Sequence, residues 1–137
     1  MALDRRLPKP AARPGAAAVE LATLLPFLAF LFFIAVDYSR LFYDYVTITD
    51  CARNGALYGC IDAGHAQDAP GIQNAARADA TNLQPPPSVT STTGTDAWGN
   101  PYVDVTVAYS FRTITNFPGM PDAVGLSRTV RMRVIPP

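Results

Sequence analysis

Side chains able to do acid–base or nucleophilic chemistry are scarce in this chain of 137 residues. It contains one histidine, His65, one glutamate, Glu20, and one lysine, Lys9. General acid–base catalysis relies on such groups, so candidates are few. No Ser/His/Asp arrangement stands out, and no glycine-rich phosphate loop precedes a predicted helix. We therefore expect no catalytic residue, no cofactor and no enzymatic activity.

Cys51 and Cys60 are the two cysteines of the chain. An even number in an exported segment favours a disulfide. In one unbroken helix, however, nine residues correspond to about 13.5 Å, whereas a disulfide needs Cα atoms closer than about 7 Å. The bond therefore requires the helix to end or bend before Cys60. Two free thiols and a bond between subunits are the alternatives.

A metal site built from the cysteines with Asp62 and His65 is not supported, because their spacing matches no zinc signature. His65 lies in the segment Ile61–Gln67, which contains Gly64 and which we predict to be a loop. A solvated histidine is the better interpretation, and we expect no metal ion.

Glu20 is the one carboxylate inside an apolar block that runs from Ala16 to Val36. A helix of this length, at about 1.5 Å per residue, spans a hydrocarbon core of roughly 30 Å. An ionisable side chain inside such a segment costs about 2.5 kcal/mol or more at mid-bilayer. The sequence therefore predicts a transmembrane helix in which Glu20 has a specific role.

The first 15 residues form a basic leader, with four cationic side chains against Asp4. By the positive-inside rule, the N-terminus is cytoplasmic and the C-terminus exported. A secretory signal would need small residues after the apolar block, but Val36–Phe42 is bulky and charged. Two interpretations of the leader remain: it belongs to an uncleaved membrane anchor, or it is cut off before the apolar block.

The rest of the chain is slightly acidic, which argues against nucleic-acid binding.

Helical periodicity continues beyond the block and predicts one long helix from Ala16 to Tyr58. Pro26 lies inside it and should kink or loosen it. A short second helix is predicted over Pro70–Leu83, with Asp68 as its N-cap. Its inward residues are Ile72, Ala76, Ala80 and Leu83.

Three segments with strand character follow: Ser88–Thr93, Val103–Phe111 and Val130–Val134. They predict a small antiparallel sheet packed on the long helix, and therefore an α+β fold. The run Phe117-Pro118-Gly119-Met120-Pro121 has neither strand nor helix character. It is expected to cover an open end of the core or to contact a membrane surface or a partner.

The order of motifs over residues 15–60 resembles the TadE-like family, the minor pseudopilins of tight-adherence (Flp) pili. Cys51 departs from the small residue expected at its position. The motifs that carry the resemblance are Gly15-Ala16-Ala17-Ala18-Val19-Glu20, then Leu24-Leu25-Pro26, then Asp37-Tyr38-Ser39-Arg40-Leu41, then Ala52-Arg53-Asn54-Gly55-Ala56.

The resemblance implies that a prepilin peptidase cuts between Gly15 and Ala16. The amine freed at Ala16 would pair with Glu20 of a neighbouring subunit, and melting near Pro26 would help packing in a filament. The implied organisation is a cleaved leader (1–15), a transmembrane helix (16–36) and an exported pilin-like head (37–137). The protein would be held in the inner membrane, with other pilin and pseudopilin subunits as partners. An uncleaved single-pass anchor presenting a small binding module is the alternative.

Overall fold

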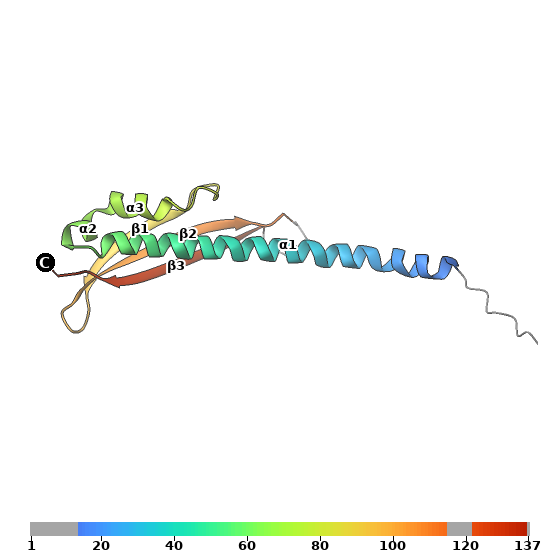
Figure 1. The fold of residues 1–137 in the computed structure, drawn as a ribbon, viewed down its shortest axis with the longest axis horizontal. Coiled ribbons are helices and arrows are strands. Elements are labelled where there is room, and N and C mark those ends of the chain that lie inside the picture. Colours follow the sequence, from blue (N-terminus) through green and yellow to red (C-terminus); the bar gives the residue numbers. More distant parts are fainter. Residues whose placement is uncertain (1–13, 115–121, 137) are drawn as a thin grey trace, which may run out of the picture. The chain divides into compact units, whose positions relative to one another are not determined.

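The computed structural model describes residues 14–114 and 122–136 (Figure 1). This part of the chain divides into two compact units, with the boundary between Ala35 and Val36. The predicted α+β class is confirmed, with strand order β1-β2-β3 in one antiparallel sheet. The elements are α1 (Pro14–Gly59), α2 (Ala63–Gln67), α3 (Ala69–Arg77), β1 (Ser88–Thr95), β2 (Pro101–Arg112) and β3 (Ala123–Arg133).

The long predicted helix is confirmed, since α1 runs from Pro14 to Gly59 and includes Pro26. The missing N–H of a proline removes one helical hydrogen bond, which membrane helices tolerate. The part of α1 from Val36 onward belongs to the second unit, which we call the head.

The head has its core on one face of the sheet. In β2, alternate valines at 103, 105 and 107 are fully buried, as the period of two predicts. Tyr109 continues this row but is half-buried, and its hydroxyl donates to the carbonyl of Gln84 at 3.2 Å. The other core residues include Ile48, Ala52 and Ala56 of α1, Ile72 and Ala76 of α3, Val89 of β1, Phe111 of β2 and Leu126 of β3.

Gly55 and Gly59 let α1 approach its neighbours closely. A Cβ atom at Gly55 would lie 3.1 Å from the Ala76 Cβ and 3.1 Å from the Val105 Cγ1. At Gly59 it would lie 3.2 Å from the Ile72 Cδ1. Such distances leave almost no room for a side chain. The small residues near the end of α1 are therefore a packing feature.

Replacing Gly55 with leucine should lower the free energy of unfolding by about 1–3 kcal/mol, because overpacking forces side chains out of their preferred rotamers. The better helix propensity of leucine offsets less than about 1 kcal/mol. Thermal unfolding of the full chain in detergent, followed by circular dichroism, measures the loss. Gly125→Leu is the control, because no atom lies within 4 Å of its Cβ position. Equal stabilities of the two variants would contradict this packing.

The sequence prediction of a loop over Ile61–Gln67 is wrong, because this segment contains α2. The Asp62 side chain caps the helix by accepting a hydrogen bond from the His65 N–H at 2.8 Å. The cap of α3 is as predicted, since Asp68 accepts from the Gly71 N–H at 3.1 Å.

The second predicted helix ends too late, because α3 stops at Arg77. Beyond it, the N–H groups of Ala80 and Leu83 donate to carbonyls three residues earlier, so the chain continues in tight turns. Both side chains are nevertheless buried, as predicted. The prediction for the last strand is too short, because β3 begins at Ala123, paired with Arg112. Arg128 interrupts the apolar alternation of Val124, Leu126, Val130 and Met132 that would have revealed its full length.

Candidate functional site

The residues with the strongest sequence signal lie at the start of α1. Gly15, Ala16 and Glu20 are all exposed and helical. Residues four apart lie on the same face of a helix, about 6 Å apart along its axis. An amine at Ala16 and the carboxylate of Glu20 would therefore share one face. The leader residues 1–13 lie outside the described residues.

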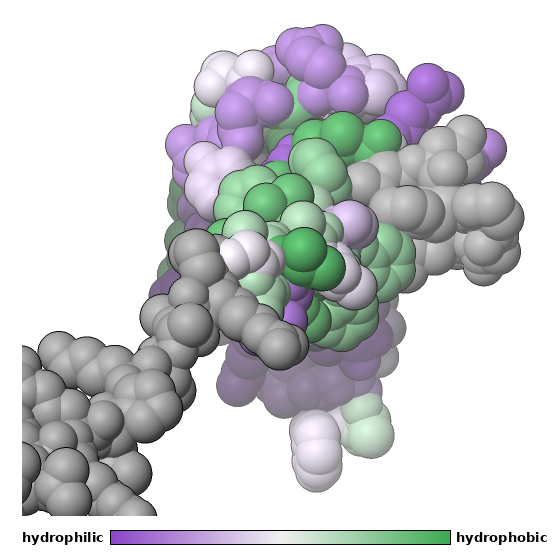
Figure 2. Space-filling view, turned by 90° about the vertical axis from the view of Figure 1, so that its right-hand side faces the viewer, coloured by the Kyte–Doolittle hydropathy of each residue, from purple (hydrophilic) through white to green (hydrophobic). Residues whose placement is uncertain are grey.

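The first half of α1 presents large apolar side chains in every direction. Each of these side chains is 41–67% exposed. Figure 2 looks at the molecule from the end where α1 begins, and apolar side chains (green) gather there. Over residues 14–114 and 122–136, α1 is the one helix long and apolar enough to span a bilayer. The apolar side chains are those of Val19, Leu21, Leu24, Leu25, Phe27, Leu28, Phe30, Leu31, Phe32 and Phe33.

Thr23 is the other polar side chain near Glu20. Its hydroxyl donates to the carbonyl of Val19 at 2.9 Å, within the same helix. A threonine satisfied by its own backbone fits an apolar environment. Within residues 14–114 and 122–136 no hydrogen bond reaches the Glu20 carboxylate, so this group is the feature of the apolar segment that calls for a partner.

Asp37 is the second residue of the head, and its role could not be inferred from the sequence. It is 8% exposed, and its carboxylate accepts from the Ile114 N–H at 3.1 Å and lies 3.3 Å from the Arg40 Nη1. Arg40 also lies over the ring of Phe111, 5.3 Å from its centroid. This buried acid therefore ties α1 to the end of β2. Arg40 is three residues away, but Ile114 is 77 residues away in sequence, which is why no local pattern reveals this hydrogen bond.

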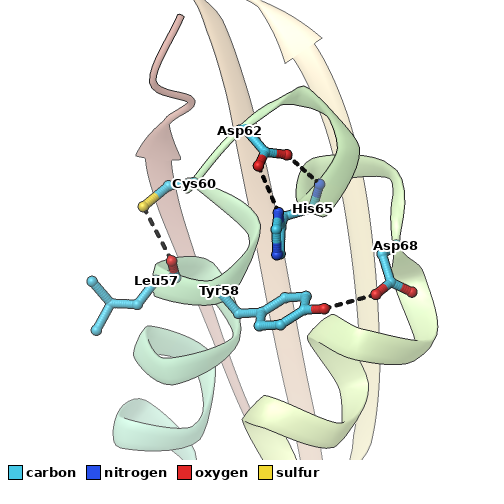
Figure 3. A network of polar contacts seen from close by, with 6 residues as sticks. All are labelled: Leu57, Tyr58, Cys60, Asp62, His65 and Asp68. Carbon is cyan, nitrogen blue, oxygen red and sulfur yellow. Dashed lines mark hydrogen bonds and ion pairs between the residues drawn. The ribbon is translucent and has the colours of Figure 1, made fainter. Parts of the chain in front are cut away.

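A polar network joins α1, α2 and α3 at the end of the head where α1 stops (Figure 3). The Tyr58 hydroxyl donates to Asp68 at 2.8 Å, and its ring meets that of His65 edge to face, with centroids 4.9 Å apart. The Asp62 carboxylate lies 2.8 Å from the His65 Nδ1. His65 is therefore a residue of α2 with local partners, and not the loop residue that the sequence suggested.

Hydrogen bonds set the protonation state of this network. The hydrogen bond from the backbone N–H of His65, and second the one with its imidazole, lower the pKa of Asp62 below the usual carboxyl range. The Gly71 N–H and the Tyr58 hydroxyl lower the pKa of Asp68 in the same way. Both groups are therefore carboxylates at neutral pH, as their capping roles require.

Cys51 and Cys60 are free thiols in the structure. The helical path continues to Cys60, whose N–H donates to the Ala56 carbonyl at 2.9 Å, so the chain does not bend between the two cysteines as an intramolecular disulfide requires. Cys51 is fully buried, and desolvation raises the pKa of its thiol, which keeps it protonated and unreactive. Cys60 is half-buried, with its sulfur 3.3 Å from the carbonyl of Leu57. The apolar run Phe117–Pro121 lies outside the described residues.

The exposed apolar half of α1 fits single-pass membrane anchoring, and the head is a small α+β unit. Residues 15–57 match the family model described as TadE-like protein, which confirms the resemblance to the TadE-like family over this segment. The match and the apolar helix fit a membrane protein associated with the Tad pilus. Comparisons with curated proteins and with solved structures found no match.

Proposed function

We propose that this chain is a minor pseudopilin-type subunit that acts in the assembly of a tight-adherence pilus. The observation that carries the proposal is the lone carboxylate of Glu20, five residues after Gly15 in a segment that matches the TadE-like family. A prepilin peptidase would remove residues 1–15, and the N-terminus at Ala16 would enter the membrane as a free amine. The chain acts as a structural subunit and not as an enzyme.

The chemistry of burial supports this role for Glu20. A desolvated ammonium needs a carboxylate close by, since an unpaired buried charge is strongly destabilising. The exposed Glu20 side chain is available to the amine of a neighbouring subunit. The apolar side chains around it would pack against the helices of other pilin and pseudopilin subunits, and Pro26 would let α1 adapt to them.

The location follows from the same features. The basic leader would remain on the cytoplasmic side until it is cut, while residues 16–36 stay in the inner membrane as a single span. The head, residues 37–137, would then lie on the exported side. Tip, initiator and regulatory roles in the pilus are all compatible with this arrangement.

Deleting the gene in cells that make tight-adherence pili tests the proposal. We expect most cells to lose their pili, because in the proposed role this subunit is needed to nucleate or extend the filament. Expression of the full chain should restore the pili. Normal piliation without the chain would contradict the proposal and favour the uncleaved anchor with a binding module.

A further inference from the structure

A hollow of about 520 Å³ opens on the head between α1 and the segment that follows α3. Ser39, Tyr43 and Asp44 of α1 form one wall, and Gln84 and Tyr109 form the other. A water molecule occupies about 30 Å³ in the liquid, so the hollow has room for one long side chain. Its lining combines polar, aromatic and apolar side chains, and it holds two charged groups, the carboxylate of Asp44 and the guanidinium of Arg40.

Asp44 is the charge in this hollow without a close partner. Among the described residues, no hydrogen bond or ion pair reaches its half-buried carboxylate. Desolvation raises the pKa of Asp44, although Arg40 acts in the opposite direction. The Arg40 guanidinium is already engaged by Asp37 and by the ring of Phe111. A further cation entering the hollow would therefore offset the desolvation of Asp44.

Arg128 is an exposed cation on β3, whereas Asp44 is a half-buried anion. It pairs across the sheet with Val107, so it lies on the face that carries the core, in a row otherwise made of apolar residues. No described residue forms an ion pair with it. Arg131 differs, because its guanidinium binds the Asp104 carboxylate at 2.6 and 2.7 Å on the other face of the sheet.

The hollow and Arg128 lie on opposite sides of the head, at similar positions along the strand direction. β1 and β3 are the two edges of the sheet, and Gln84 precedes β1. In Figure 1, α3 lies above α1 and β3 lies below it. Tyr109, which lines the hollow, pairs with Leu126, two residues before Arg128. Two strand residues correspond to about 7 Å, so the hollow and Arg128 differ little in their position along the strands.

We infer that heads of this chain associate side by side, with Arg128 of one copy inserted into the hollow of the next and paired with Asp44. The occupant is a second copy because the same head carries both complementary features on opposite sides. Such a contact is heterologous, so it can repeat from copy to copy as a row or ring. The inference goes beyond the proposed function and does not depend on cleavage of the leader.

Charge reversal in the full chain tests the contact. Sedimentation in a mild detergent at low salt would measure self-association of the wild type and of the variants Arg128→Glu and Asp44→Arg. We expect each variant alone to associate at least about ten-fold more weakly, since like charges would then meet. An equal mixture of the two variants should associate like the wild type, because the two variants can alternate and each contact between them again joins opposite charges.

Matched controls are Arg53→Glu and Asp50→Arg, which make the same charge changes at exposed positions of α1 outside the hollow. Both should associate like the wild type. If Asp44→Arg lowers the melting temperature, Asp44→Asn replaces it and should also weaken association. A monomeric wild type, unchanged association of the Arg128→Glu variant, or a mixture that stays dissociated would each overturn the inference. None of these results would affect processing at Gly15.

Discussion

Replacing Gly15 with leucine should leave the chain with its leader attached. In the proposed mechanism the peptidase must accommodate the residue before the cut bond, and leucine adds a bulky side chain there. Gly15 is also the second residue of α1. Leucine stabilises a helix by up to about 1 kcal/mol relative to glycine, so the bond would open less readily for the peptidase. We expect processing to fall almost completely, seen as a slower-migrating band on immunoblots of membranes.

Gly125→Leu provides the control for this experiment. It makes the same exchange at an exposed glycine with open space around its Cβ position, far from the cut in the sequence. This variant should be processed like the wild type. Full processing of the Gly15→Leu variant would contradict the proposed cut, because it would show that the residue at this position does not matter to the peptidase.

Replacing Glu20 with glutamine should spare membrane insertion and impair assembly. Glutamine has nearly the same shape and a good helix propensity, so α1 should form as before. The amine at Ala16 would then face an uncharged amide, and it would be buried among helices without a counter-charge. We expect the amount of chain in sheared pilus fractions to fall on the order of ten-fold or more, with unchanged amounts in the membrane.

Thr23→Val is the matched control for Glu20→Gln. It removes a polar group from the same apolar segment, but that hydroxyl bonds only within the helix, to Val19. Assembly should therefore be unchanged. Normal pili in cells carrying the Glu20→Gln variant would show that this carboxylate has no pairing role, and the proposal would lose the observation that carries it.

Elements with regular periodicity could be predicted from the sequence. The long helix, the alternating strand β2 and the inward residues Ile72 and Ala76 all follow from local patterns of apolar side chains. The glycines of α1 also have a local signature, since small residues at helical spacing indicate close packing.

Features that depend on distant partners could not be predicted. The burial of Asp37 depends on Ile114, and the full length of β3 depends on its pairing with β2. Arg128 on the core face breaks the alternation that identifies a strand. Helix α2 was missed because five residues are too few for a periodic pattern, and its Asp62 cap was the one available signal.

The cut after Gly15 and the pairing role of Glu20 remain predictions, and one measurement tests them most directly. It is the N-terminal sequence of the chain, purified from membranes of cells with and without the prepilin peptidase. The account predicts an N-terminus at Ala16 when the peptidase is present, and a chain that keeps its leader when it is absent. An N-terminus still at Met1 in cells that contain the peptidase would contradict the pseudopilin role.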